Sequence, residues 1–314
     1  MLVTIGDWNF HIPQNKQKEV ILIYIETHMH ISLDGMDGAA FRKEIKSSKN
    51  KAEELIRKNV RAYKERGIIA IRDGGDPINL CAITRRIAKE EGIIYKTPIH
   101  AIYKRGHYGS YIGKVIDDIR DFKAVFSEME KDQPDFIKIP LSGMMNFDTY
   151  GEVGDLAFNE EELDYMVKFA QDKGLPTMVH VNSREGVQRA IKAGVDTIEH
   201  GYYMTDEELY ALKESKTIWV PTLTPLGNIC FSGDERHKEQ IKTIKRIFDE
   251  QSRNVKKAYK IGVKLAIGSD GGAYKVYHGQ GFLDELKYMN EAGIELEELK
   301  RIGYENGKKA LGIS

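Results

Sequence analysis

The chain has 314 residues, of which 41% are hydrophobic and 30% charged, a composition typical of a folded globular protein and not of a disordered one. Its 47 Lys and Arg residues nearly balance 48 Asp and Glu residues, so the basic excess typical of general nucleic-acid binding is missing. The longest apolar runs fall far short of the ~20 residues that cross a bilayer, and residues 1–10 do not resemble a signal peptide. Two cysteines are too few for a disulfide framework, so the expected compartment is a reducing cytoplasm.

Short β-branched runs alternate with longer amphipathic, charged stretches along the chain. The runs predicted as strands are, in order, residues 21–27, 67–72, 93–103, 136–140, 176–181, 195–199, 217–221 and 263–269. The stretches predicted as helices are residues 50–65, 80–90, 117–131, 160–173, 184–193, 206–215, 235–260, 282–291 and 296–310. Glycines such as Gly174, Gly194 and Gly262 follow these stretches, where a left-handed residue ends a helix.

This alternation predicts an α/β protein with a parallel sheet covered by helices. Eight strand–helix units are the number that closes a (β/α)8 TIM barrel. A doubly wound open sheet is the main competitor, but the first turn from strand to helix contains no G-x-G-x-x-G. We therefore predict a short extension over residues 1–20, in which residues 2–5 and 9–12 form at most a hairpin, followed by a barrel over residues 21–314.

Polar side chains stand at the ends of five predicted strands, which is where the active site of a barrel lies. These six residues are His28, His30, Lys138, His180, His200 and Asp270. The intervals between them fit whole strand–helix units of a barrel of about 250 residues. Their joint occurrence at strand ends predicts that they converge in one site.

The histidines are candidate metal ligands. His28 and His30 are separated by one residue, so both side chains point to the same side of the first strand. Inside a barrel that side is the interior, and two imidazoles there form half of a metal site. The alternative is a pair of hydrogen-bonded surface histidines. His180 and His200 are either ligands or satisfied core histidines.

Lys138 lies on the same face of an apolar strand as Phe136 and Pro140, a location that is unfavourable for a lysine unless it is paired or neutral. Burial and nearby metal ions lower the pKa of a lysine and favour the free amine. A free amine reacts with CO2 to form a carbamate, whose two oxygens can bridge two metal ions. The alternative is a side chain that extends to solvent. Asp270 is either a metal ligand or the N-cap of the next helix.

With these residues in order, the sequence resembles the amidohydrolase superfamily. The family pattern is H-x-H on strand one, Lys on strand four, His on strands five and six, and Asp on strand eight. The phrases THMH, GIIAIRDGG, IKIPLSG, GVDTIEHG, PTLTP and GSDGG are also similar to the family. The resemblance covers residues 23–314 and is strongest to the branch of metal-dependent dipeptidases of the prolidase and Xaa-Arg type.

The resemblance implies a dinuclear metal centre. The ligands of the more buried ion are expected to be His28, His30 and Asp270. The ligands of the more exposed ion are expected to be His180 and His200. Lys138, carboxylated by CO2, is expected to bridge the two ions together with a hydroxide. Zinc is the metal that this ligand set favours, with manganese, iron or cobalt as substitutes.

The implied reaction is hydrolysis of an amide or peptide C–N bond in a small substrate such as a dipeptide or an N-acyl amino acid. Asp270 would accept the proton of the attacking hydroxide and deliver it to the leaving group, with Lys138 as the second catalytic residue. Many relatives in this branch carry an accessory β-sandwich, and we expect a barrel without a full one. The expected partner is a small-molecule substrate, with no nucleic acid or membrane, and a homo-oligomer is left open.

Substrate contacts are expected from the loops that follow the strands. The candidates are His107, Tyr108, Tyr202, Tyr203 and His278, and each has an equally plausible surface role. His107 is preferred because relatives often have a histidine in that loop. Lys104 or Arg105 is a candidate partner for a substrate carboxylate.

Three other functions remain open from the sequence. A mononuclear deaminase on the same barrel needs a Glu shortly after the strand-five histidine, where this chain has Val181, Asn182 and Ser183. A phosphotriesterase or lactonase would use the same metal ligands. A non-catalytic binding protein on a decayed scaffold would be expected to have lost some of the ligands.

Overall fold

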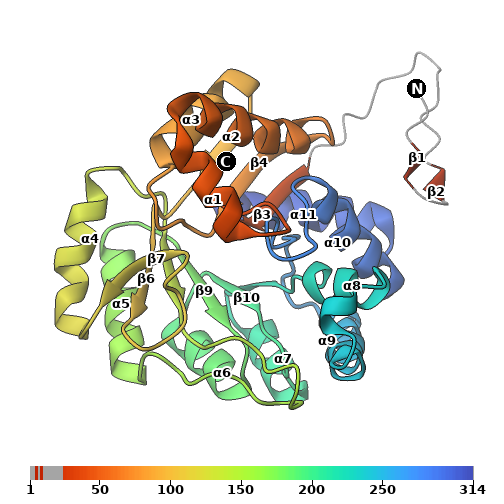
Figure 1. Cartoon of the computed structure of the whole chain (residues 1–314). Coiled ribbons are helices and arrows are strands. Elements are labelled where there is room, and N and C mark those ends of the chain that lie inside the picture. Colours follow the sequence, from red (N-terminus) through yellow and green to blue (C-terminus); the bar gives the residue numbers. More distant parts are fainter. Residues whose placement is uncertain (1–3, 6–7, 10–23, 314) are drawn as a thin grey trace.

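The computed structural model describes residues 4–5, 8–9 and 24–313 (Figure 1). Its strands are β1 (Thr4–Ile5), β2 (Trp8–Asn9), β3 (Tyr24–Met29), β4 (Ile68–Asp73), β5 (Ile94–Lys96), β6 (Ala101–Lys104), β7 (Gly113–Ile116), β8 (Ile137–Pro140), β9 (Thr177–Val181), β10 (Thr197–His200) and β11 (Ile218–Val220). Its α-helices are α1 (Gly38–Ser47), α2 (Lys49–Lys64), α3 (Cys81–Glu91), α4 (Phe122–Glu130), α5 (Glu160–Asp172), α6 (Arg184–Ala193), α7 (Asp206–Glu214), α8 (Thr224–Phe231), α9 (Ile241–Ile261), α10 (Gln280–Glu291) and α11 (Leu296–Leu311). Two 3-10 helices are η1 (Ile119–Asp121) and η2 (Glu235–His237).

From β3 onward the paired strands are parallel, in three sheets with the orders β3-β4-β5, β6-β7 and β11-β10-β9-β8. Residues 263–269, predicted as the eighth strand, form isolated parallel bridges on both sides, Trp219 with Leu265 and Met29 with Gly271. These bridges connect β11 to β3 across residues 263–271. The predicted α/β fold with parallel strands is thus confirmed, but the ladders among the described residues do not form one continuous ring.

Several predicted elements differ from the observed ones. The predicted strand 93–103 is divided into β5 and β6, because Pro98 lacks an N–H donor and Ile99 has a left-handed backbone with φ of 68°. The predicted helix 235–260 begins only at Ile241, after η2. In the N-terminal extension, Thr4 pairs with Asn9 in an antiparallel ladder, and the other residues of the predicted hairpin lie outside the described ones.

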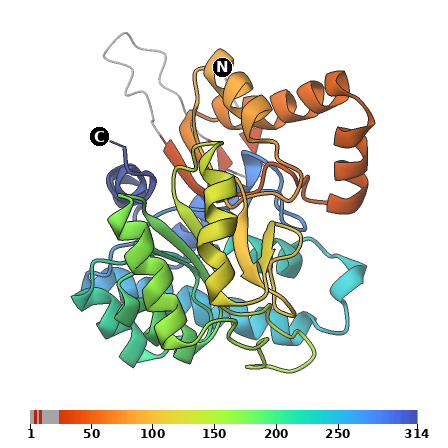
Figure 2. The same ribbon diagram turned by 90° about the vertical axis from the view of Figure 1, so that its left-hand side faces the viewer.

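Most strands of the larger sheets are buried on both faces, as parallel strands between helices are. Every residue of β3, β8, β9, β10 and β11 is buried. Helices α5, α6 and α7 contact one another in succession around the outside (Figure 1), and Figure 2 shows α4 and α5 on the face turned toward the viewer. Helix α11 packs on β3, where Gly307 permits the approach because a Cβ there would lie 2.9 Å from the Ile25 Cβ.

In the part of the chain that the structure describes, no helix has both the length and the apolar composition of a membrane span.

A buried ion pair ties two of the sheets together. Arg72 of β4 donates from Nη2 to Glu199 of β10 over 2.9 Å, and both side chains are fully buried. The Nε of Arg72 also donates to the carbonyl of Thr27, and Nη1 donates to Thr197 Oγ1 and to the carbonyl of Ala310. The guanidinium therefore links strands that lie in different sheets and the last helix.

We predict that Arg72→Met destabilises the protein by about 3–5 kcal/mol, because removing one partner of a buried pair leaves the other charge buried and uncompensated. Chemical denaturation followed by circular dichroism measures the change. Arg120→Met is the control, since Arg120 pairs with Asp118 on the exposed surface and its loss should leave the unfolding midpoint unchanged. Equal midpoints for the two variants would contradict the importance of the buried pair.

Candidate metal centre

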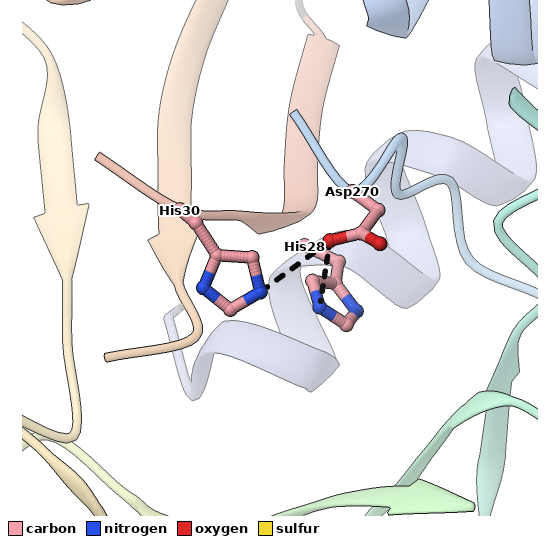
Figure 3. A group of neighbouring side chains, drawn as sticks. All are labelled: His28, His30 and Asp270. Carbon is pink, nitrogen blue, oxygen red and sulfur yellow. Dashed lines mark ion pairs between the residues drawn. The ribbon is translucent and has the colours of Figure 1, made fainter. Parts of the chain in front are cut away.

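Three of the predicted ligands converge at the ends of β3 and of residues 263–269. Oδ1 of Asp270 lies 3.5 Å from Nε2 of His28 and 3.4 Å from Nε2 of His30 (Figure 3). One ligand atom from each residue lies within 4.8 Å of the other two. This spacing is that of atoms that could surround one metal ion.

Backbone bonds hold these residues in register. The N–H of Asp270 donates to the carbonyl of His28 over 2.8 Å, and the N–H of His30 donates to the carbonyl of Gly271 over 2.7 Å. Gly74 leaves room for one ring, because a Cβ at this position would lie 2.3 Å from Cε1 of His30. The glycines of the phrases RDGG and GSDGG therefore have a steric reason to be next to the site.

Lys138 of β8, His180 of β9 and His200 of β10 line the same cavity, which has a volume of about 650 Å³ and also contains His28, His30 and Asp270. The ring of His200 lies with its centroid 4.6 Å from that of His180 and 5.0 Å from that of His28. All six polar residues singled out at strand ends therefore face one cavity.

Hydrogen bonds to the outer edges of the rings orient them. Nδ1 of His28 lies 2.7 Å from Oε2 of Glu199, and Nδ1 of His200 lies 2.7 Å from the hydroxyl of Thr222. The carboxylate can only accept this bond, so the proton of His28 is on Nδ1 and the lone pair is on Nε2, toward Asp270. The ring of His180 is held at Nε2, which lies 3.2 Å from the amide nitrogen of Asn182.

Burial lowers the pKa of the nitrogen groups, and the neighbouring histidines keep the carboxylate ionised. Desolvation, assisted by Lys138, lowers the pKa of His28 to about 4 and that of His180 to about 3. Desolvation also lowers the pKa of the Lys138 ammonium to about 8, against the attraction of Glu199. For Asp270 burial acts to raise the pKa, but the hydrogen bond from His30 and the electrostatic interaction with His28 hold it well below its usual range. Neutral imidazoles and an ionised carboxylate are the forms that bind metal ions.

Two atoms of the cavity are suited to a ligand that the chain itself does not supply. Lys138 Nζ and His28 Nε2 are buried, and neither has a hydrogen-bond partner among the described residues. Buried polar atoms in proteins are nearly always paired, and an unpaired one calls for an explanation such as an ion. The imidazole and carboxylate donors of the cavity fit divalent metal ions.

The backbone at the ends of the strands is strained. His200, Tyr203, Thr222 and Asp270 have φ values of 68°, 66°, 47° and 58°, a region that costs a non-glycine residue about 1–3 kcal/mol. Thr222 is β-branched, for which a positive φ is rarest. Such strain gathers at functional sites, and here it turns the ring of His200 into the cavity.

The family model of the amidohydrolase family matches residues 21–314. The chain belongs to the amidohydrolase family. The prediction of an amidohydrolase-type hydrolase is thereby confirmed at the level of the family. An uncharacterized protein of Mycobacterium tuberculosis is 28% identical over 151 residues, which cover 47% of this chain and 40% of that protein. The ochratoxinase of Aspergillus niger is 30% identical over 114 residues, which cover 36% of this chain and 24% of that protein. The matches thus span less than half the length of either relative.

Solved structures match most of this amidohydrolase. A Xaa-Pro dipeptidase with methionine bound in the active site aligns with a TM-score of 0.75 and 27% identity, covering 92% of this chain and 75% of that one. The A. niger ochratoxinase structure aligns with a TM-score of 0.74 and 18% identity, covering 91% and 70% of the two chains. A prolidase-like protein from Bifidobacterium longum aligns at 0.70 and 20%, covering 93% and 69%. The last two likenesses concern the fold alone.

Only some of the loop residues predicted to contact the substrate line the cavity. Tyr108 lines the cavity and stacks on His180 with the ring centroids 4.5 Å apart. His107 and Tyr203 do not line it: His107 is in a turn closed by its N–H on the carbonyl of Lys104, and Tyr203 packs on Tyr150.

Three other residues that were predicted to contact the substrate are already bonded to other residues of the amidohydrolase. Both ring nitrogens of His278 face protein oxygens, the Tyr63 hydroxyl at 2.9 Å and the Leu33 carbonyl at 2.7 Å. Lys104 pairs with Glu162 over 2.8 Å, and Arg105 pairs with Asp117. Tyr202, by contrast, lines the cavity and donates to the carbonyl of Thr222.

Several residues of the site were missed by sequence reasoning. Glu199 and Thr222 orient ligand rings, and they stand in the phrases IEHG and PTLTP, next to or near a predicted ligand. Their place in these phrases was a usable signal. Their partners belong to other strands, so the sequence alone did not show which ring each residue orients. Arg236 and Phe147, which also line the cavity, are in loops without a motif.

Thr222→Val tests the role of the hydroxyl that faces His200. Valine keeps the size and the β-branching, but leaves Nδ1 of His200 without its partner, so we expect the affinity for one metal ion to fall about 10- to 100-fold. Titration of metal-free protein with Zn²⁺ against a competing chelator measures it. Thr84→Val is the matched control, because Thr84 is also buried and its hydroxyl has no partner among the described residues. If both variants bound zinc as the wild type does, Thr222 would have no orienting role.

Proposed function

We propose that this amidohydrolase is a metal-dependent hydrolase that cleaves the amide or peptide C–N bond of a small molecule such as a dipeptide or an N-acyl amino acid. The observation that carries the proposal is that the imidazoles of His28, His30, His180 and His200, the carboxylate of Asp270 and the unpaired buried amine of Lys138 line one cavity. The similarity to a Xaa-Pro dipeptidase and to an ochratoxinase supports an amide-cleaving function. We further propose that residues 263–269 are the eighth strand of a (β/α)8 barrel that comprises residues 21–314.

The six side chains would hold two divalent metal ions, with zinc as the favoured metal. One ion would be held by His28, His30 and Asp270, whose ligand atoms converge. The other would be held by His180 and His200. Lys138, as a carbamate formed with CO2, would bridge the ions, and its depressed pKa favours the free amine that this reaction requires. When bound, such ions lower the pKa of a water molecule and polarise the carbonyl that it attacks.

The residues of the chain itself would supply proton transfer and enclosure. Asp270 is ionised and lies at the centre of the cluster, so its carboxylate can accept a proton from the attacking water and pass it to the leaving nitrogen. The C–N bond breaks as the C–O bond forms, and the products are a carboxylic acid and an amine. Tyr108, stacked on His180, covers one side of the reaction centre and limits the access of bulk water.

Metal analysis combined with a substrate panel tests the proposed function. We expect about two metal ions per chain after reconstitution with Zn²⁺, hydrolysis of dipeptides or N-acyl amino acids, and loss of this activity on treatment with a chelator. Lactones and phosphotriesters belong in the panel because they need the same metal ligands. Turnover confined to those two classes would refute the assignment to C–N bonds, and metal binding without any turnover would leave only a binding function.

Lys138→Ala tests the proposed bridge. We expect the variant to lose bound metal and activity together, because alanine can form no carbamate. The cavity left by the lysine should admit acetate or propionate, whose carboxylate would restore part of the metal content and of the activity. Lys264→Ala is the control, since Lys264 donates to the carbonyl of Ser215 away from the cavity. Unchanged metal content in Lys138→Ala would exclude the bridge.

A further inference from the structure

Arg236 stands apart from the other charged residues of the cavity. Among the described residues that line the cavity it is the only arginine, and Lys138 of the candidate centre is the only lysine. Its guanidinium has no carboxylate of the described residues within ion-pair distance, whereas most other arginines among the described residues form ion pairs, such as that of Arg301 with Glu305 over 2.8 Å. A cation without a partner that faces a cavity is a feature that a ligand anion can satisfy.

The acidic residues close to Arg236 in sequence are engaged elsewhere. The carboxylate of Asp234 accepts from the Tyr274 hydroxyl, from Nζ of Lys275 at 3.0 Å, and from the backbone N–H of Arg236 at 2.7 Å. Glu235 pairs with Lys238 over 3.0 Å. The neighbouring carboxylates therefore leave the guanidinium free for another anion.

The guanidinium of Arg236 stacks on the ring of Tyr274, which is close in the sequence to Asp270 of the candidate centre. Cζ of Arg236 lies 4.4 Å from the centroid of Tyr274, a cation–π contact that positions the guanidinium against the ring. Tyr274 follows Asp270 by four residues, and the turn between them is closed by a 2.9 Å bond from the N–H of Ala273 to the carbonyl of Asp270. Arg236 is thus held in a defined position relative to Asp270.

Part of the cavity wall is apolar. Phe147, from the loop after β8, packs against the neighbouring His237 with the ring centroids 5.6 Å apart. Leu226 and Ile229 of α8 contribute aliphatic groups to the same cavity, and so does Met144, whose side chain is half exposed. A charged or strongly hydrated substituent would lose hydration against these groups without gaining a partner.

We infer that Arg236 binds the carboxylate of the substrate, and that the substrate is an N-acyl amino acid or dipeptide whose carboxylate-bearing residue has an apolar side chain. This inference rests on the proposed function and specifies its substrate class. The planar guanidinium matches a carboxylate through two parallel N–H donors. The apolar side chain would lie against Phe147 and Leu226. Lys104 and Arg105, the cations suggested by the sequence for this role, are already paired outside the cavity.

The test compares N-acetyl-leucine with N-acetyl-leucinamide, which differ only in the charge and the donor set of the terminal group. Release of leucine or leucinamide is followed by mass spectrometry in the zinc-loaded wild type, Arg236→Met and Arg236→Lys. We expect Arg236→Met to raise KM for N-acetyl-leucine about 10- to 100-fold, the range for a lost charge-assisted hydrogen bond, and to leave KM for the leucinamide unchanged. Arg236→Lys should be intermediate, because it keeps the charge without the fork.

Arg246→Met is the matched control, since Arg246 also stacks on a tyrosine ring, that of Tyr150, but does not line the cavity. It should behave as the wild type on both compounds. N-acetyl-aspartate should be a poorer substrate than N-acetyl-leucine if the side chain packs against the apolar wall, and equal or better turnover of the aspartate compound would overturn that part. Equal kinetics of Arg236→Met and wild type on N-acetyl-leucine would overturn the carboxylate assignment while leaving the proposed hydrolysis intact.

A binding measurement separates this inference from the proposed function. Calorimetry of N-acetyl-leucine on the same variants reports carboxylate recognition whether or not the amide is cleaved. If the wild type cleaved no amide but Arg236→Met bound N-acetyl-leucine about 10-fold more weakly or worse, the proposed function would fail and the assignment of Arg236 would stand. Equal binding by Arg236→Met and the wild type would overturn the assignment.

Discussion

The buried carboxylate of Glu199 is the group on which the candidate centre and the surrounding strands both depend. It faces Nδ1 of His28 at 2.7 Å and Nη2 of Arg72 at 2.9 Å, from two adjacent strands of another sheet. Burial acts to raise the pKa of Glu199, but Arg72 and His28 lower it to about 2. The carboxylate therefore stays ionised, and its charge determines which nitrogen of His28 carries the proton. One carboxylate thus links two sheets through Arg72 and orients the ring of His28, so a change at Glu199 would affect both the core and the candidate ligand.

Burial has the opposite effect on the nitrogen groups around this carboxylate. Desolvation lowers the pKa of His28, His180 and His200, so that these imidazoles are held in the form that has a free electron pair, and it lowers the pKa of Lys138 to about 8, which makes the free amine more accessible. Lys138 Nζ is also buried without a hydrogen-bond partner among the described residues. A buried polar atom without a partner destabilises the folded protein when no ligand is bound to it. A metal ion or a carbamate would remove that penalty, and binding at the site and stability of the fold are therefore coupled.

The six polar residues at strand ends could be predicted from the sequence because parallel strands bring their carboxyl ends to one edge, whatever the details of packing. Glu199 could not be assigned in this way. Regular alternation places it on the opposite side of the strand from His200, but the φ of 68° at His200 breaks the alternation, and both side chains then approach His28. Arg236 was hidden for another reason, because residues 235–260 have the charge pattern of one helix, whereas η2 and a turn precede α9.

The parts of the site that were predictable and those that were not correspond to two physical classes of structure. The candidate metal ligands are on or directly after strands that are buried on both faces, where neighbouring ladders leave a side chain little freedom. The walls that would contact the rest of a substrate come from the loop after β8, from α8 and from η2, none of which is a strand of the parallel sheets. Because loops tolerate substitution and insertion better than the strands that carry them, the reacting centre can stay fixed while the walls vary. Arg236 is one of these wall residues, and its stacking on Tyr274, one turn from Asp270, gives a loop residue a defined position relative to the candidate metal ligands.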